Sequence, residues 1–413
     1  MFLIYQLLLS LALIFSPIII VYRLFKNKEH ETRFVEKFSF NTKKRINGRL
    51  IWFHGASVGE ILSIIPIVKY YEKHKKIKQI LVTSSTLSSA KVFEKFKFKK
   101  AVHQFYPIDY HFINKKFLNF WKPNLAIFIE SEIWPCMFNL LDKKKIPLVL
   151  LNARITNKTY KKWSKLKKFS KSVFGKINVS FPQNKETKYY LNKLKLKKVK
   201  QLGNLKFAEN SSNHLDKIPK YLKREFNKKK VWVASSTHKD EEIFCAETHL
   251  KLKKKISNLV TIIIPRHVHR VNEISDKIKS MNLVVKIHSL KPKNLSNVDI
   301  YIVDTFGETK KFHEIASSVF LGGSIINRGG QNPLEAARCG AKIFHGPNTD
   351  NFKDIYKLLN TLKISYKINS PERLAKLITF KKNKNIANKI KLIGNTILKK
   401  TLNELNLLIK NEF

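Results

Sequence analysis

A glutamate stands where the first predicted strand of the chain gives way to a helix. Glu60 ends the sequence HGASVGE, in which Gly59 and other small residues leave its surroundings open to a substrate. A carboxylate at this point can act as a general base if it reaches a hydroxyl group. The helix dipole favours its ionised form, which a base requires but which also limits its basicity. Acidic residues also favour helix N-termini for structural reasons alone, and Glu60 by itself fits that simpler role better.

Two further carboxylates directly follow the apolar run 125–129. Glu130 and Glu132 stand at positions i and i+2 in the sequence ESEIWP. Charged groups beside a buried strand are costly unless they line a cleft. A helix cap is the alternative, but the Trp-Pro pair makes the segment less generic. We therefore interpret these carboxylates as part of a site.

Cationic residues follow later strands in the same way. Lys206, in the sequence GNLK, lies near a predicted domain junction where it could meet a leaving phosphate, although lysine is abundant throughout the chain. Arg266 follows Pro265 and carries a guanidinium fork suited to phosphate. His238 and His267 could be ligands, but solvated or hydrogen-bonded histidines are commoner.

Two glycine-containing loops could hold a ligand through their backbone. Around Gly307, in DTFGE, the N–H groups could bind a base or a phosphate, although an ordinary turn would look similar. Residues 318–347 predict strand, glycine loop, helix and strand. Asn332 fits a helix N-cap, Pro333 the first helical position and Glu335 the third, where a capping box can form. Such a helix start also suits a phosphate, and Glu335 is equally compatible with capping and with binding.

Several common motifs are absent from the sequence. Neither GxxxxGK[ST] nor GxGxxG occurs, which argues against ATPase and NAD-dependent activities. No Asp-x-Asp motif of the kind that holds a metal and a diphosphate sugar is found. The three cysteines lie far apart, outside any CxxC or Cys/His spacing, which indicates a reducing compartment and no structural zinc. We therefore expect neither a metal nor a cofactor.

Alternating strand and helix patterns must position these residues. They predict an α/β protein with parallel sheets, whose loops at the carboxyl ends of the strands face a crevice. The predicted strands are 51–54, 80–84, 102–106, 125–129, 148–151, 178–181 and 200–202 in the first half, and 231–234, 260–264, 284–287, 300–303, 319–321 and 342–344 in the second.

The alternation stops once, which divides the chain into two domains with a cleft between them. Residues 208–229 are rich in Asn, Ser and Lys and are predicted to be a linker. The first domain is then 24–207 and the second 230–413, including C-terminal helices. Residues 1–23 form a separate N-terminal segment.

The N-terminal segment predicts attachment to a membrane. Residues 2–22 carry no charge and are long enough for a helix to cross a hydrocarbon core of ~30 Å. Basic residues follow at once, which predicts that the domains lie in the cytoplasm. A cleaved signal peptide lacks support, because no basic region precedes the apolar run. An anchor that lies on the membrane without crossing it stays open.

The chain is strongly basic, with 80 Lys and Arg against 30 Asp and Glu and a formal net charge of +50. Such a charge suits nucleic acid, an anionic membrane or an acidic substrate. Because the lysines are spread evenly along the chain, with no single basic module, we do not expect a nucleic-acid partner.

Taken together, the motifs resemble the 3-deoxy-D-manno-octulosonic acid (Kdo) transferases. The resemblance covers nearly the whole chain, through HGASVGE, ESEIWP, LNARIT, GNLKF, ASSTHKDEE, PRHVHR, DTFGE, GGQNPLEAA and GPNTDNF in this order. Any one of these motifs is weak evidence, but the ordered set is specific.

This resemblance implies a GT-B glycosyltransferase with two Rossmann-like domains, the acceptor domain first and the donor domain second. It implies transfer of Kdo from CMP-Kdo to the 6'-hydroxyl of the tetraacylated lipid A precursor (lipid IVA), without a metal, at the cytoplasmic face of the inner membrane. Glu60 is then the proton acceptor, and Glu130 and Lys206 stabilise the transition state. The implied CMP-binding residues are Pro265, Arg266, Phe306, Gly307, Glu308, Asn332, Pro333, Leu334 and Glu335.

Some residues depart from the family pattern. Gln331 stands where His is common and Phe306 where Met is frequent, so details of the donor pocket can differ. Gly55 replaces a usual Ala, and Ser88-Ser89 stand where a Thr-Gly pattern is usual. A different GT-B nucleotide-sugar enzyme, or a binding protein for anionic lipid or nucleic acid, are the alternatives.

Overall fold

The computed structural model describes residues 2–209 and 218–412, and the chain divides into two compact units. The first unit contains Met1–Asn210 together with Ile393–Phe413, and the second contains Ser211–Leu392. The last helix, α16 (Lys384–Glu412), thus begins in the second unit and belongs to the first from Ile393 onward. The sequence analysis had assigned all of 230–413 to the second domain.

The predicted linker 208–229 is only partly irregular. Its residues 210–217 lie outside the described residues, but α9 (Lys220–Asn227) is a helix. Leu222 and Phe226 stand four residues apart on one face of α9 and are both buried. This apolar spacing anchors the helix to the second unit, and the local wealth of Lys and Asn concealed it.

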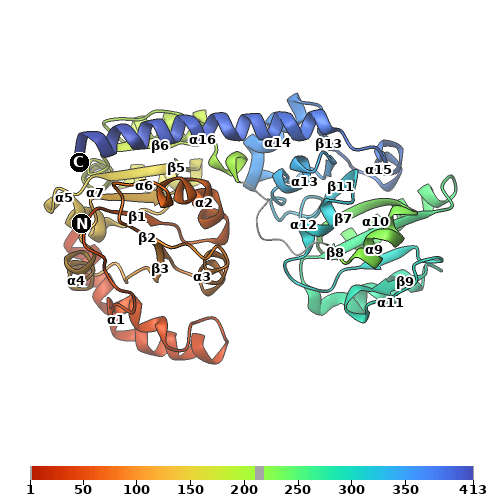
Figure 1. The fold of residues 1–413 in the computed structure, drawn as a ribbon, viewed down its shortest axis with the longest axis horizontal. Coiled ribbons are helices and arrows are strands. Elements are labelled where there is room, and N and C mark those ends of the chain that lie inside the picture. The colour runs from red at the N-terminus through yellow and green to blue at the C-terminus, as the bar shows by residue number, and fades with distance from the viewer. Residues whose placement is uncertain (1, 210–217, 413) are drawn as a thin grey trace. The chain divides into compact units, whose positions relative to one another are not determined.

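The first unit is built on a six-stranded parallel sheet with the order β3-β2-β1-β4-β5-β6 (Figure 1). Its central strands are buried along their whole length and mostly apolar because helices cover both faces of a parallel sheet. One face packs a core that includes Trp52, Phe117, Trp121, Phe128 and Phe138. The strands are β1 (Leu50–His54), β2 (Gln79–Ser84), β3 (Ala101–Phe105), β4 (Leu125–Ile129), β5 (Leu148–Ala153) and β6 (Val179–Pro182).

Helices alternate with these strands, as predicted. They are α2 (Val58–Glu72), α3 (Leu87–Glu94), α4 (His111–Trp121), α5 (Pro135–Lys143), α6 (Asn157–Lys165), α7 (Lys167–Phe174) and α8 (Lys185–Lys193), with short 3-10 helices η1 (Arg33–Phe38) and η2 (Leu205–Ala208). The predicted strand 200–202 was wrong, because β6 pairs there only through an isolated bridge between Ser180 and Val199. Gly203, with a φ of 115°, then turns the chain into η2.

The N-terminal helix α1 (Phe2–Phe25) packs against the first unit through a few side chains. The hydroxyl of Tyr5 donates a hydrogen bond of 2.8 Å to Asp109, and its ring contacts Phe169. Among the described residues, no single helix is long and apolar enough to cross a membrane. The pair Ile4–Leu11 and Leu13–Phe25, bent by 42°, together has the length and composition for it.

The second unit contains a seven-stranded parallel sheet with the order β13-β12-β11-β7-β8-β10-β9. All six strands predicted in this half are confirmed, and the short polar β13 was missed. The strands are β7 (Lys230–Thr237), β8 (Leu259–Pro265), β9 (Val285–Ile287), β10 (Ile300–Ile302), β11 (Ser318–Leu321), β12 (Lys342–His345) and β13 (Ser365–Lys367). The helices, besides α9, are α10 (Glu241–Lys253), α11 (Val271–Lys279), α12 (Thr309–His313), α13 (Leu334–Arg338), α14 (Lys353–Thr361) and α15 (Pro371–Leu377), with 3-10 helices η3 (Val268–Arg270), η4 (His288–Leu290) and η5 (Asp350–Phe352).

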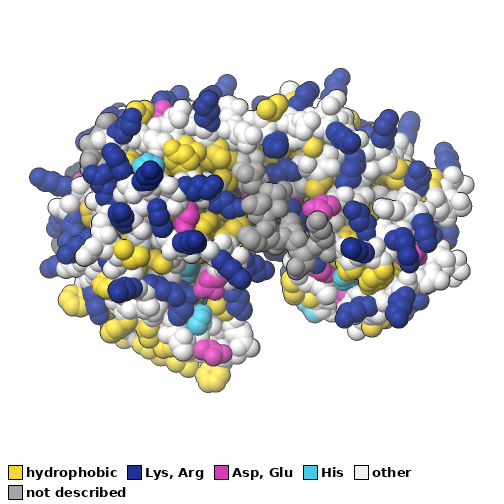
Figure 2. Space-filling view, viewed as in Figure 1, with side chains coloured by type: hydrophobic (Ala, Val, Ile, Leu, Met, Phe, Trp, Pro, Cys, Tyr) yellow, Lys and Arg dark blue, Asp and Glu magenta, His cyan; other side chains and the backbone are white. Residues whose placement is uncertain are grey.

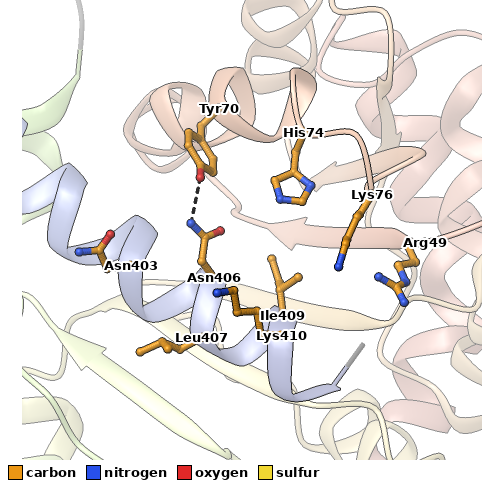
Figure 3. Close-up of a pocket in the computed structure, with 9 residues that line it drawn as sticks. All are labelled: Arg49, Tyr70, His74, Lys76, Asn403, Asn406, Leu407, Ile409 and Lys410. Carbon is orange, nitrogen blue, oxygen red and sulfur yellow. Dashed lines mark hydrogen bonds between the residues drawn. The ribbon is translucent and has the colours of Figure 1, made fainter.

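The C-terminal turns of α16 pack beside α2 within the first unit. Asn406 links both tyrosines of α2, because it accepts a hydrogen bond of 3.0 Å from the Tyr71 hydroxyl and donates one of 2.9 Å to the Tyr70 hydroxyl. A pocket of about 650 Å³ opens next to this contact (Figure 3). Through these bonds the end of the chain becomes part of the first unit.

Candidate active site

The carboxyl ends of β1 and β4 lie side by side at the point where the strand order of the first sheet reverses. After β1 the chain continues to β2 on one side, whereas β4 continues to β5 on the other. In open parallel sheets this divergence leaves a crevice in which ligands bind. Glu60 lies in the first turn of α2 after β1, and Glu130 directly follows β4. The two predicted carboxylates therefore flank the crevice.

Glu60 makes the contacts of a helix cap, the simpler of the two roles that its sequence left open. Its carboxylate accepts hydrogen bonds of 2.8 Å from the Ala56 N–H and from the Ser57 hydroxyl. The Ser57 oxygen in turn accepts from the Glu60 N–H at 3.3 Å, which completes a capping interaction at the start of α2. An added Cβ at Gly55 would lie 3.0 Å from the Glu60 Cβ, so a small residue is needed there.

The acidity of Glu60 differs from the expectation. Burial raises the pKa of Glu60 to about 7, and the nearby charges of Glu130 and Glu132 act in the same direction. Hydrogen bonds from Ser57 and Ala56 oppose this shift. The predicted preference for the ionised form, based on the helix dipole, is thus outweighed by desolvation. A carboxyl group with a pKa near neutrality is well matched to general-base catalysis.

Glu130 and Lys206 form an ion pair. The Lys206 Nζ lies 2.6 Å from the Glu130 Oε1, and the two side chains are only 15% and 8% exposed. Glu130 adopts a left-handed φ of 54°, which is rare outside glycine. Strained backbone of this kind is often found at functional sites. The structure therefore joins two predicted site residues that stand far apart in the sequence.

Asn152 helps to hold this pair, and the sequence analysis assigned it no role. It sits at an irregularity in β5 with a φ of 53°. Its Oδ1 accepts a hydrogen bond of 3.0 Å from the Leu205 N–H, next to Lys206. Its Nδ2 lies 3.5 Å from Glu130 Oε1, at the limit of a hydrogen bond. The only feature of the sequence that could have indicated a role for Asn152 was its place in the motif LNARIT.

The helix α16 supports the segment that carries Lys206. An added Cβ at Gly394 would lie 2.2 Å from the backbone oxygen of Phe207, so the two backbones are in direct contact. Beside them, an added Cβ at Gly203 would lie 2.8 Å from the Ile397 side chain. Glycine at position 394 thus allows α16 to approach η2 closely.

Glu132 is held differently from Glu130. Its Oε2 lies 3.1 Å from His54 Nε2 and accepts a hydrogen bond of 2.9 Å from Trp134 Nε1. The other nitrogen of His54 lies 3.0 Å from the Thr83 hydroxyl. Burial lowers the pKa of His54, which favours the neutral ring. A hydrogen on Nε2 lets it donate to Glu132 while Nδ1 accepts from Thr83.

In the described contacts Glu132 therefore binds neighbouring side chains of the first unit, His54 and Trp134. His54 was not predicted as its partner. The charge of Glu132 still contributes to the raised pKa of Glu60. The signal for His54 was its position at the end of β1, inside HGASVGE.

In the second unit, the predicted donor-binding residues follow strands that lie close together in the sheet. Pro265 ends β8, the loop with Phe306 and Gly307 follows β10, and Asn332 lies between β11 and α13. These strands belong to the run β11-β7-β8-β10 of the sheet, and their carboxyl ends share one edge. Phe306 is 78% exposed and Arg266 is also exposed, so both are open to a ligand.

Glu308 is already engaged. Its carboxylate lies 2.8 Å from His288 Nε2 and 2.5 Å from Lys311 Nζ, and it accepts a hydrogen bond from the Thr305 hydroxyl. These contacts fix the end of the loop, while Gly307 at its tip has open space around its Cα.

The helix α13 begins one residue later than predicted. Pro333 is its N-cap and Leu334 its first residue, while the Asn332 Oδ1 accepts a hydrogen bond of 3.1 Å from the Leu334 N–H. Asn332 thus caps the helix with its side chain, although it stands one residue before the N-cap Pro333. Glu335 lies in the first turn and is half-buried.

A cationic cluster surrounds His238 at the end of β7. Burial lowers the pKa of His238, and the positive charges of His267, Arg328, Arg266 and Arg270 act in the same direction. The rings of His238 and His267 lie 5.6 Å apart. Arg270 is paired with Glu242 and Glu273, and the exposed Arg266 and Arg328 leave positive charge at the end of parallel strands that suits an anion such as phosphate.

Three amide groups of the loop after β11 are not open to a phosphate, whereas the predicted phosphate site, at the start of α13, lies further along the chain. The Glu241 carboxylate accepts hydrogen bonds from the N–H groups of Gly323, Ser324 and Ile325. Glu241 belongs to the motif ASSTHKDEE, and the sequence analysis assigned it no role. Among the described residues, no group of three His, Cys, Asp or Glu side chains is arranged to hold a metal ion.

Known structures share this fold. A Staphylococcus aureus MnaA–UDP complex is 13% identical, with a TM-score of 0.54, and the match covers 88% of this chain and 97% of that one. A glycosyltransferase from Rickettsia africae ESF-5 is 13% identical with a TM-score of 0.53, over 89% and 99% of the two chains. The two units thus define a GT-B-like α/β protein.

Sequence comparison is more specific. A family model described as 3-deoxy-D-manno-octulosonic-acid transferase (kdotransferase) matches residues 32–209. A 3-deoxy-D-manno-octulosonic acid transferase of Rickettsia bellii is 36% identical over 88% of this chain and 86% of its own length. A probable mitochondrial 3-deoxy-D-manno-octulosonic acid transferase of Arabidopsis thaliana is 32% identical over 86% and 82%. The chain belongs to the 3-deoxy-D-manno-octulosonic acid transferase family.

Proposed function

We propose that this protein transfers Kdo from CMP-Kdo to the 6'-hydroxyl of the tetraacylated lipid A precursor, lipid IVA, in lipopolysaccharide biosynthesis. Family membership supports the transfer of Kdo. The observation that carries the mechanism is Glu60, whose pKa of about 7 suits a base at the crevice between β1 and β4.

In the proposed reaction the acceptor hydroxyl loses its proton to Glu60. Its oxygen forms a bond to the anomeric carbon of Kdo while the bond from that carbon to the phosphate oxygen of CMP breaks. CMP leaves with the electron pair, and attack from the opposite face inverts the anomeric configuration. A glutamate that is half-ionised near pH 7 provides enough of the base form and still takes up the proton readily.

The leaving phosphate is stabilised by fixed positive charge. We assign stabilisation of the transition state to Lys206, held by Glu130 in the first unit, and binding of the donor phosphate to Arg266 in the second unit. Preorganised cations in a partly buried site stabilise developing negative charge strongly. We propose that transfer proceeds without a metal ion, because these groups supply the charge that a metal supplies in other transferases.

The donor nucleotide is proposed to bind the second unit along one edge of its sheet. The candidate contacts are Pro265, Arg266, Phe306, Gly307, Glu308, Asn332, Pro333, Leu334 and Glu335. The exposed ring of Phe306 suits stacking on a base. In the described contacts the Glu335 side chain does not cap α13, and its carboxylate suits a ribose hydroxyl.

We further propose that α1 attaches the protein to the cytoplasmic face of the inner membrane. The helix exposes large apolar side chains along its length, seen as a yellow band on the lower left of Figure 2: Ile4, Leu7, Leu8, Leu11, Ile14, Phe15, Ile18, Ile19, Val21, Tyr22 and Phe25. Such a continuous apolar surface is unusual on a protein surrounded by water alone. Basic residues follow α1 directly, which suits anionic lipid headgroups and a bisphosphorylated lipid substrate.

The proposal is tested by mass analysis of the acceptor after incubation of the detergent-purified full chain with CMP-Kdo and the lipid A precursor. The expected product is heavier by one or more Kdo units, appears together with CMP, and forms equally well in excess EDTA. An unchanged acceptor, in the presence of folded protein that binds CMP, would contradict the proposed activity. Loss of product in EDTA would contradict the metal-free mechanism alone.

A further inference from the structure

A single carboxylate joins two loops at the point where the strand order of the second sheet reverses. Glu241, at the start of α10, is 1% exposed. One carboxylate oxygen accepts hydrogen bonds from the N–H groups of His238 at 3.0 Å and Gly323 at 2.7 Å. The other accepts from Ser324 at 3.1 Å and Ile325 at 3.0 Å. Four backbone donors from the loops after β7 and β11 therefore converge on one side chain.

The two loops pack closely around this carboxylate, and the four amide groups are already satisfied by it. An added Cβ at Gly322 would lie 2.7 Å from Glu241 Oε2 and 2.4 Å from the Ser236 backbone oxygen. At Gly323, where φ is 65°, an added Cβ would lie 3.2 Å from the His238 ring. Glycine is required where the two loops approach so closely. The amide concavity that could have bound a phosphate is thus occupied by the protein itself.

The motif GPNTDNF holds the same loop from the other side. We call residues 322–332 the glycine loop. The Asn348 Nδ2 donates to the Ile325 oxygen at 3.0 Å, and the Asn351 Nδ2 donates to the Arg328 oxygen at 3.1 Å. The Asn351 N–H also bonds the Gly329 oxygen at 3.1 Å. Glu241 fixes the beginning of the glycine loop, and Asn351 fixes its middle.

The glycine loop includes Arg328 and ends at Asn332, one of the proposed donor-binding residues. Arg328 contributes to the positive charge around His238. The loop ends at Asn332, which caps α13, and α13 carries Glu335. Arg266 is tied to the same region, because its N–H bonds the Thr237 oxygen at 2.9 Å. Any shift at Gly323–Ile325 would therefore displace both the cationic cluster and the helix that follows the loop.

We propose that Glu241 is a positioning residue for the CMP donor, which holds the glycine loop so that Arg328 and Asn332 are preorganised around the donor phosphate. This inference rests on the proposed function. It also places the donor phosphate outside the amide concavity, near the cationic cluster. Preorganisation of this kind reduces the ordering cost of binding, and supporting hydrogen bonds of a site are often as important as direct contacts.

The test is CMP binding to the full chain, measured by calorimetry, for wild type, Glu241→Gln and Glu247→Gln. Glutamine retains the shape of Glu241 but accepts with one oxygen only, and its NH2 group faces N–H donors. Glu247 is an exposed residue of the same helix and provides a matched control. Glu241→Gln is expected to weaken CMP binding by about tenfold or more, and Glu247→Gln by less than about twofold.

Steady-state kinetics separate positioning from loss of folded protein. Glu241→Gln should raise KM for CMP-Kdo and leave KM for the lipid acceptor unchanged. A merely structural role would reduce the active fraction, lowering kcat with both KM values unchanged, and that result would overturn the proposal. If Glu241→Gln does not fold, Asn351→Ala removes the side-chain bond to the Arg328 oxygen in the middle of the loop and should weaken CMP binding in the same direction.

The outcomes also distinguish this inference from the proposed function. If wild type binds CMP but transfers no Kdo, the proposed function fails, and the effect of Glu241→Gln on CMP affinity still decides the positioning role. If wild type does not bind CMP, both are overturned. Unchanged CMP affinity in Glu241→Gln and in Asn351→Ala would overturn the positioning role alone.

Discussion

The Lys206 ammonium lies 2.6 Å from a carboxylate oxygen of Glu130, with both side chains mostly shielded from water. Two residues from distant segments of the first unit thus form one pair at the crevice. A buried ion pair contributes little net stability, but loss of one partner leaves an uncompensated charge. Variants of this pair can therefore distinguish its contribution to stability from its contribution to catalysis.

Lys206→Met should lower the free energy of unfolding by about 3 kcal/mol and abolish transfer, because Glu130 remains buried without its partner. Adding Glu130→Gln should restore most of the stability, since the isolated charge is removed, but should not restore transfer. Chemical denaturation and product formation measure the two effects. Recovery of activity in the double variant would show that the pair has only a structural role.

The pH dependence of kcat/KM should report the titration of Glu60. Because burial raises the pKa of Glu60 to about 7 and the base must be ionised, activity should fall by about tenfold for each pH unit below 7. Above that pH the rate should level off. Initial rates between pH 5 and 8.5 measure this, with stability checked at each pH. A flat profile below pH 7 would exclude Glu60 as a base with this pKa.

Gly394→Ala should reduce transfer without any change to a residue that contacts substrate. The added methyl group would lie 2.2 Å from the Phe207 oxygen, so η2 and Lys206 must move, at a cost of about 1–3 kcal/mol in stability. Lys399→Ala, on an exposed part of the same helix, is the control and should behave as wild type. Wild-type kinetics for Gly394→Ala would indicate that α16 does not position Lys206.

Replacing Leu7, Leu11, Ile14 and Ile18 together by Ser should release the protein from membranes. These side chains are between 50% and 68% exposed, so the folded domains should keep their thermal stability. Burial of such groups in lipid provides about 1.5–3 kcal/mol each, and the loss should be visible in sedimentation with vesicles that contain anionic phospholipid. Undiminished vesicle binding would show that α1 is not the attachment site.

The sequence predicted the alternation of strands and helices because parallel strands buried on both faces are apolar along their whole length. It could not show that Glu60 would titrate near pH 7. That property depends on burial and on the charges of Glu130 and Glu132, which come from a different strand. The dipole argument considered only the local helix, and it therefore gave the wrong direction for the acidity of Glu60.

Supporting residues were also beyond the sequence analysis. Asn152, His54 and Glu241 belong to recognisable motifs, but each acts through hydrogen bonds to a segment distant in the chain. The return of α16 to the first unit depends on the contact of Gly394 with Phe207. No local pattern predicts such a contact, because it requires knowledge of which helix packs on which loop.

The central claim is tested most directly by the single-turnover rate of Kdo transfer by Glu60→Gln and wild type. CMP affinity is measured on the same preparations. The account predicts wild-type CMP binding and a rate of transfer reduced by at least about a hundredfold at pH 7.5, because the base is lost while the donor site is untouched. Transfer by Glu60→Gln at the wild-type rate would contradict the assignment of Glu60 as the proton acceptor.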